Sequence, residues 1–224
     1  ETYISEKYSG FRGINANIGA LWNVNRILTI GAVLKTPFTA DIDHEYTENW
    51  IQSDESGNET GSLNESYSDK IELDMPMSYG LGVSYRFSDQ FSMGCDIYRT
   101  EWSRFILTDD DGNKANAASW KPKGDSNVED TTQIRLGGEY LILKPERNLV
   151  IPVRAGFFYD PEPSEDDEKI FYGLTLGSGA YFGNVLIDMA YQLRWGKGIE
   201  MNNLIANSEA DVTQHTVLVS LIYH

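Results

Sequence analysis

The sequence IELDMPMSYGLGVSYRF, residues 71 to 87, alternates apolar and polar side chains along its whole length. Every odd position from Ile71 to Phe87 is apolar, while the even positions are small, polar or charged, as at Glu72 and Arg86. Because successive side chains of a strand point to opposite faces, the pattern predicts a strand with one wholly apolar face. Globular strands usually run for about five or six residues. A strand of this length needs an apolar environment along all of it, and a small soluble domain rarely offers one.

The composition narrows the class of protein. The chain has 224 residues, of which 41% are hydrophobic, and its 34 acids against 18 bases give a formal net charge of -16. The modest hydrophobic fraction is compatible with a transmembrane barrel, whose strands alternate apolar-out with polar-in. The sequence contains no run of about 18 apolar residues, which excludes a transmembrane helix and leaves a barrel open. The acidic balance argues against a nucleic-acid partner, because phosphate binding needs a basic patch.

The acidic residues gather in three polar segments that lie between the alternating runs, 44–70, 108–130 and 160–169. We expect these segments to be solvated loops, and the alternative is that they bridge divalent ions to an anionic surface. The lone Cys95 cannot form an intramolecular disulfide or a cysteine zinc cluster, and its parity places it on the lipid-facing row. We expect no metal and no cofactor.

The same alternation recurs along the chain and predicts about nine strands. They cover residues 14–22, 27–42, 71–87, 91–97, 132–142, 148–159, 171–182, 185–195 and 213–223. Their connections alternate between short turns, such as FSDQ and FGN, and the long acidic segments. Short turns on one side and long loops on the other match the periplasmic and extracellular sides of an outer-membrane barrel. The predicted fold is therefore all-β, a transmembrane antiparallel up-and-down β-barrel.

The odd number of strands predicts that part of the barrel lies upstream. Single-chain bacterial barrels normally have an even number of strands with both ends periplasmic. An odd number of strands should therefore precede this chain, which has no initiator Met and no signal peptide. The alternative is that ETYISEKY, residues 1–8, is a weak strand that completes a ten-stranded barrel.

The polar faces of the predicted strands carry charges of both signs, which should see water, a plug or one another. These residues are Lys35, Asp74, Arg86, Asp96, Arg135, Glu139, Arg154, Asp188 and Arg194. The plainer interpretation is an ion-paired ladder that holds the barrel in shape. The functional interpretation is a wall that contacts an internal plug or the headgroup of a ligand.

Apolar side chains also occur at inward positions and are the candidate substrate-binding residues. They are Leu21, Tyr98, Trp102, Phe158, Phe171 and Leu186. A general porin lumen would be mostly polar, so apolar patches inside suggest an apolar passenger. A bulge after Ile97 would instead turn Tyr98 and Trp102 outward.

Catalytic patterns are weak, and we expect no catalytic residues and no enzyme. Imidazole bases are confined to His44, His215 and His224. An outer-membrane protease could keep an acid–base pair from Asp41, Asp43 and His44 near the extracellular rim. Such a pair needs a facing set of carboxylates, which the sequence does not reveal.

Three blocks of sequence resemble the FadL/TodX family of outer-membrane channels for hydrophobic compounds. Residues 10–42, which contain GALWNVNRILTIGAVLKTPF, resemble the family's "gaLw…lt(l/i)Ga.yktpf" strand pair. Residues 73–105, LDMPMSYGLGVSYRFSDQFSMGCDIYRTEWSRF, are similar to its "lP.s..lGvayr.sd.f.l..d..yt.Ws.f" segment. IRLGGEYLI and VIPVRAGFFYDPEPS match its "rlG.EY…p.RaG.fydp.p" segment. The blocks stand in the family's order and cover most of the chain.

The resemblance implies a fourteen-stranded barrel, plugged by an N-terminal hatch, that carries long-chain fatty acids or aromatic hydrocarbons by diffusion. On this basis residues 1–224 are the C-terminal part of one barrel domain, and the hatch and first strands are absent from the chain. The expected partners are hydrophobic small molecules, outer-membrane lipid, lipopolysaccharide and, in vitro, detergent, and the expected state is a monomer. The alternatives are a polar-solute porin or structural barrel and, with the least support in the sequence, an outer-membrane protease.

Overall fold

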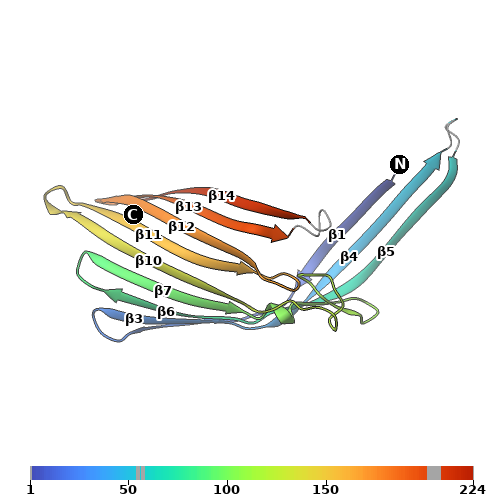
Figure 1. The fold of residues 1–224 in the computed structure, drawn as a ribbon, viewed down its shortest axis with the longest axis horizontal. Coiled ribbons are helices and arrows are strands. Elements are labelled where there is room, and N and C mark those ends of the chain that lie inside the picture. Colours follow the sequence, from blue (N-terminus) through green and yellow to red (C-terminus); the bar gives the residue numbers. More distant parts are fainter. Residues whose placement is uncertain (1, 54–55, 57–58, 201–207, 224) are drawn as a thin grey trace.

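The fold is built from strands in two antiparallel sheets, and two short 3-10 helices lie in the connections between strands (Figure 1). The structure is a computed structural model that describes residues 2–53, 56, 59–200 and 208–223. The larger sheet has nine strands in the order β14-β13-β12-β11-β10-β7-β6-β3-β2. The smaller sheet has five strands in the order β1-β4-β5-β8-β9. The prediction of an all-β antiparallel fold is confirmed.

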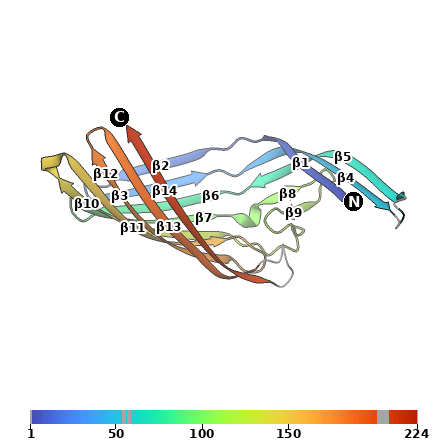
Figure 2. The same cartoon turned by 90° about the horizontal axis from the view of Figure 1, so that it is seen from above.

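The nine strands of the larger sheet match the nine predicted segments. They are β2 (Asn17–Asn23), β3 (Leu28–Lys35), β6 (Ser78–Arg86), β7 (Phe91–Thr100), β10 (Thr131–Lys144), β11 (Leu149–Glu162), β12 (Lys169–Phe182), β13 (Val185–Glu200) and β14 (Glu209–Tyr223). The sheet is curved and open, with β2 and β14 as its edges (Figure 2). One end carries short turns, including 87–90 and the 3-10 helix Pro145–Arg147 between β10 and β11. The opposite end carries the long connections, as predicted.

The three long strands of the smaller sheet project away from the long-loop end of the larger one (Figure 1). The strands of the smaller sheet are β1 (Thr2–Arg12), β4 (Phe38–Ser53), β5 (Glu59–Met75), β8 (Ile106–Thr108) and β9 (Lys114–Asn116). We call β1, β4 and β5 the arm. The predicted loop 44–70 is therefore wrong in large part, because β4 and β5 extend through most of it. The ten-stranded alternative is also wrong, since β1 is a strand but pairs with β4 outside the nine-stranded sheet.

The stretch 71–87 is not one strand, which corrects the prediction. β5 ends at Met75 and β6 begins at Ser78, and Pro76 between them has no N–H to donate to a neighbouring strand. The segment 27–42 divides at Thr36 and Pro37 in the same way. Lys35 pairs with Ser78 and Phe38 with Met75, so both strands cross the break over the same number of residues. The outward face of the larger sheet therefore continues into one face of the arm.

The apolar row of the larger sheet lies on its surface. Leu81, Leu176 and Val217 are 66%, 61% and 65% exposed. Buried side chains such as Ala40, Ile71, Ile106 and Val128 instead belong to the smaller sheet and the long 101–130 connection. No helix in the described residues has the length and apolar character needed to cross a membrane. Within the described residues, the fold offers the outward row no second layer of protein to pack against.

Candidate functional site

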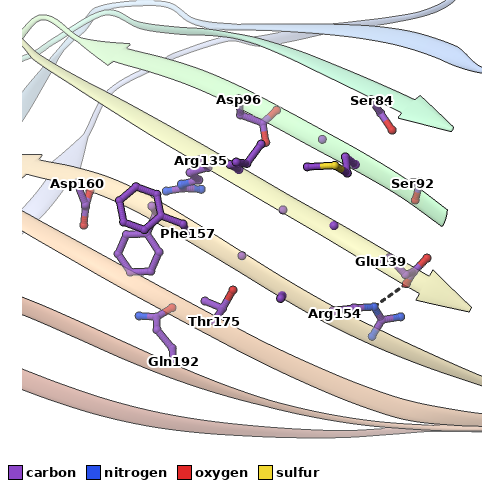
Figure 3. A pocket seen from close by; sticks show the side chains of 18 of the residues that line it. Ser84, Ser92, Asp96, Arg135, Glu139, Arg154, Phe157, Asp160, Thr175 and Gln192 are labelled. Carbon is purple, nitrogen blue, oxygen red and sulfur yellow. Dashed lines mark hydrogen bonds and ion pairs between the residues drawn. The ribbon is translucent and has the colours of Figure 1, made fainter. Parts of the chain in front are cut away.

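The inner face of the nine-stranded sheet holds two open cavities. The first, of about 740 Å³, lies across β7, β10, β11, β12 and β13, and charged side chains line it together with Thr175 and Gln192 (Figure 3). The second, of about 660 Å³, lies across β2, β3, β6, β7 and β10 and contains Leu21, Val33 and Tyr98. Asp96 and Arg135 line both cavities. The two cavities are therefore neighbouring parts of one surface, the first more charged and the second more apolar.

Arg154 on β11 is the centre of a network on the inner face. Its Nε donates to Glu139 Oε2 on β10 at 2.7 Å (Figure 3). Its Nη1 donates to Asp188 Oδ1 on β13 at 2.7 Å. Its Nη2 donates to the hydroxyl of Tyr181 on β12 at 3.0 Å. The Asp188 carboxylate lies over β12, in the space that a Cβ at Gly179, the residue directly opposite Asp188, would occupy. One cation thus links four neighbouring strands.

A second network surrounds Arg194 on β13. Its guanidinium forms ion pairs with Asp160, at 3.3 Å, and with Glu162, both on β11. It also lies 3.6 Å from the centroid of the Phe171 ring. Gln133 extends the network by donating to Asp160 at 2.5 Å. Of the nine charges predicted to form an ion-paired ladder, Glu139, Arg154, Asp188 and Arg194 do form ion pairs. The other five take part in none of the ion pairs of the described residues; they are Lys35, Asp74, Arg86, Asp96 and Arg135.

The large inner side chains lie beside glycines of the neighbouring strand. Gly80 pairs with Tyr98, and a Cβ at Gly80 would lie 2.7 Å from the tyrosine ring. Gly173 pairs with Phe158, whose ring occupies the space of a Cβ there. Glycine therefore lets each ring lie flat across the sheet instead of standing upright from it. This arrangement leaves ring faces open to the lumen side.

The structure brings together only some of the six predicted site residues. Leu21 and Tyr98 line the second cavity, and Phe158 lines the first. Phe171 is 4% exposed and lies under Arg194. Leu186 lies near the short-turn end, opposite Tyr181 and Ile222, and lines neither cavity.

The proposed bulge after Ile97 does not occur, because β7 pairs regularly with both β6 and β10 through Thr100. Tyr98 therefore faces inward, with the Lys35 Nζ 5.8 Å from its ring centroid. Trp102 lies beyond the strand, in the 3-10 helix Trp102–Arg104. Sequence reasoning missed the glycines beside the rings, Gly80 and Gly173, although their inward parity was the available signal.

Residues 101–130 form a rim segment at the long-loop end. The Trp102 Nε1 donates to Thr131 Oγ1 at 3.1 Å, and its ring meets Phe105 edge-on. Asn116 is 2% exposed and donates from its side chain to the Trp102 carbonyl oxygen at 3.1 Å. These contacts fix Trp102 as a structural anchor of the rim. Its ring is half-buried among rim residues and not in either cavity.

Glu165, in the β11–β12 connection, closes the rim segment. It accepts hydrogen bonds from the backbone N–H of Asn127 at 2.6 Å and from the Ser126 hydroxyl at 3.1 Å, and it pairs with Lys121 at 3.3 Å. Burial raises the pKa of this carboxyl, but the hydrogen bonds outweigh burial and lower the pKa overall. Asp130 behaves alike, because hydrogen bonds from Ser103 outweigh its burial and lower its pKa.

The acid–base pair that the protease alternative requires at the rim does not form from Asp41, Asp43 and His44. Asp41 and Asp43 lie on the face of β4 opposite to His44, because their positions differ by an odd number of residues. The His44 Nδ1 instead lies 2.8 Å from Asp69 Oδ1 on β5. In the described part of the chain, no group of three His, Cys, Asp or Glu side chains could hold a metal ion. His224 lies outside the described residues.

An antiparallel sheet with an exposed apolar outer row, a charged inner face, and turns short at one end and long at the other defines a β-barrel protein of the outer membrane. The chain belongs to the outer membrane protein transport protein family (OMPP1/FadL/TodX), whose model matches residues 10–216. The protein is therefore an outer-membrane protein of a family of transport channels. No curated protein sequence matches the chain.

Two solved structures share the fold. The "CymD monoaromatic hydrocarbon channel" is similar with a TM-score of 0.56 and 19% sequence identity, over 94% of this chain and 50% of that chain. The toluene transporter TodX of Pseudomonas putida is similar with a TM-score of 0.52 and 18% identity, over 82% of this chain and 44% of that chain. The chain thus spans about half the length of these neighbours.

Proposed function

We propose that the protein is a channel for the passive uptake of hydrophobic molecules, either long-chain fatty acids or aromatic hydrocarbons. The observation that carries the proposal is the ring of Tyr98 over Gly80, beside Val33, in the cavity of about 660 Å³ that Leu21 also lines. That volume lies within the ~300–1,000 Å³ range of small-molecule sites. The names of the two structural neighbours support the aromatic hydrocarbon as one candidate class of substrate.

The energetics suit passive transfer. A single-ring hydrocarbon that buries about 150–200 Å² of apolar surface gains about 4–5 kcal/mol at ~25 cal/mol per Å². That corresponds to a dissociation constant of roughly 0.2–1 mM, which allows rapid release. Binding and release of this kind need no covalent step and no cofactor.

The open edges of the sheet are the other part of the proposal. Unpaired backbone groups of β2 and β14 would be costly in the hydrocarbon layer, where open sheet edges do not occur. We propose that residues 1–224 form the C-terminal part of a single barrel domain and that further strands cover both edges.

The alternative function is a polar-solute porin, which the charged first cavity favours. Ion-paired arginines such as Arg154 and Arg194 line that cavity, and a polar lumen is typical of porins. In planar bilayers, the porin would conduct ions steadily, whereas the hydrocarbon channel would conduct little and would accelerate hydrocarbon entry into vesicles.

The test compares two tyrosines of equal size in the full-length protein. Tyr98→Ala should weaken toluene and oleate binding by about three- to tenfold, since about 1 kcal/mol corresponds to fivefold. Tyr140→Ala, on the outward row, should leave both affinities unchanged. Unchanged affinity in Tyr98→Ala, together with steady ion conductance of the parent protein, would refute the hydrocarbon channel in favour of the porin.

A further inference from the structure

The two faces of the arm differ sharply in chemistry. The register of β1, β4 and β5 puts five aromatic rings on one face, those of Tyr8, His44, Tyr46, Trp50 and Tyr67. The carboxylates of Glu6, Glu48, Glu65 and Asp69 lie on the same face. Lys7 and Lys70, the lysines of these strands, lie on the opposite face, where they are paired in register with Glu45 and Asp43. We call the first surface the aromatic face of the arm.

The four rings of Tyr8, His44, Tyr46 and Tyr67 form an ordered row across all three strands. The Tyr8 and His44 rings stack with centroids 4.7 Å apart, and the Tyr67 ring meets His44 edge-on at 6.0 Å. Tyr46 stacks on Tyr67 at 5.0 Å. Tyr8 and Tyr67 are each 51% exposed, although their rings contact one another through His44. The row is thus held in place before any partner binds, which reduces the entropy lost on binding.

The carboxylates make this face negative. The Tyr46 hydroxyl donates to Glu48 Oε2 at 2.7 Å, and the Tyr8 hydroxyl donates to Glu6. The hydrogen bond to Glu48 raises the pKa of Tyr46 to about 12, so the phenol stays neutral. Among the ion pairs of the described residues, Lys7 pairs with Glu45 on the opposite face at 3.0 Å, and none joins a lysine or arginine to Glu6, Glu48 or Glu65.

We propose that the aromatic face of the arm docks a cationic polypeptide segment that presents lysine or arginine side chains. The π faces of the rings attract cations, and the neighbouring carboxylates supply complementary charge. An anionic lipopolysaccharide headgroup is the wrong charge for this face. A neutral saccharide could stack on the rings but would gain nothing from several negative charges without a cation between them. Because β4 and β5 project beyond the nine-stranded sheet, a segment in the extracellular medium could reach the face (Figure 1).

The experiment measures binding of a labelled octalysine peptide to the full-length protein in nonionic detergent. Octaglutamate and a neutral maltooligosaccharide serve as comparison probes. The octalysine affinity should fall steeply with added salt, since the Debye length shrinks from ~30 Å at 0.01 M to ~3 Å at 1 M. Glu48→Gln/Glu65→Gln should weaken octalysine binding about tenfold, while Tyr67→Leu should weaken it severalfold without changing the net charge.

The matched control removes the same charge from the other face. Asp43→Asn/Glu45→Gln should change the octalysine affinity by less than about twofold, because both side chains point away from the aromatic face. An equal loss in both double variants would reduce the effect to net charge and overturn the proposal. Binding of maltooligosaccharide that is lost in Tyr67→Leu would overturn it in favour of a saccharide. Toluene uptake, which depends on cavities away from the arm, should be unchanged in every variant and confirms folding.

Discussion

Arg154→Met should destabilise the barrel wall by removing the cation that links β10, β11, β12 and β13. In the parent protein this guanidinium contacts Glu139, Asp188 and Tyr181. Methionine fills a similar length of the inner face but carries no charge and no donor. The variant therefore leaves two carboxylates on the same patch of the inner face without their shared partner.

The size of the loss follows from the contacts and from exposure. A hydrogen bond to a charged group contributes about 1.5–3 kcal/mol, and Arg154 forms two with carboxylates. The side chains of Arg154, Glu139 and Asp188 are 36%, 33% and 26% exposed, so solvent screens part of this energy. We expect the free energy of unfolding to fall by roughly 2–4 kcal/mol.

A companion variant separates the lost attraction from the carboxylates left behind. Arg154→Met/Glu139→Gln/Asp188→Asn removes all three charges together, and replacing a complete ion network is far less costly than breaking it. The triple variant should recover at least half of the loss. The assay is reversible urea unfolding of the full-length protein in lipid vesicles, followed by tryptophan fluorescence and far-UV circular dichroism, with coincident transitions as the check on two-state behaviour.

Two results would refute this reasoning. If the free energy of unfolding of Arg154→Met lay within about 0.5 kcal/mol of the parent value, as it does for an ordinary surface substitution, solvent screening would have removed the net contribution of the network to stability. A triple variant no more stable than the single one would mean that the leftover carboxylates of Glu139 and Asp188 carry no penalty.

Three further perturbations address the glycine contacts and the rim. Gly173→Ala puts a methyl group where the Phe158 ring lies, so it should cost about 1–3 kcal/mol in urea unfolding; a fully stable variant would show that the ring moves freely. Trp102→Phe keeps a ring but removes the donor to Thr131, so hydrogen exchange in the rim segment should quicken about fivefold for a loss of about 1 kcal/mol, and parental protection would contradict the anchor role. The pKa of the Glu165 carboxyl lies below the ordinary 4.5, so its contribution to the stability of the rim segment is complete above that value and is lost as the pH falls through the lowered pKa. Hydrogen exchange in the rim segment, corrected for the intrinsic exchange rate, should therefore rise in that pH range in the parent but not in Glu165→Gln. Identical pH profiles in the two proteins would show that Glu165 does not hold the rim segment closed.

The strands and their faces could be predicted from the sequence because side-chain alternation is a local property of extended backbone. The same property concealed the break at Pro76, since the parity of β5 and β6 continues across it. Alternation cannot distinguish a straight ribbon from a bent one. The sequence predicts a loop at 44–70 because acids and polar residues dominate it, although β4 and β5 extend into it and Tyr46 and Tyr67 stack in register there.

Contacts across strands could not be predicted, because they depend on register. Tyr98 meets Gly80, and Phe158 meets Gly173, only because the strands are aligned at those residues. A shift of one residue would move each ring to the other face. The alternation therefore indicated which strand side chains face inward, but not that Phe171, Leu186 and Trp102 lie outside both cavities.

The proposed hydrophobic passenger would have to pass a charged inner face, and two of the arginines there are paired in a way that makes this less costly. Arg154 and Arg194 each contact two carboxylates, so neither offers a free cation to a passing solute. A hydrophobic molecule that displaces water beside such a pair leaves the ion pair intact and loses little, whereas an unpaired charge would have to be desolvated. The rings of Tyr98 and Phe158, held flat by glycine, then remain as the surfaces that gain from losing water. Pairing of this kind lowers the cost of an apolar path beside Arg154 and Arg194 in the first cavity. The second cavity is lined instead by Lys35, Asp96 and Arg135, which take part in none of the ion pairs of the described residues, so the rings and aliphatic side chains there must supply the gain.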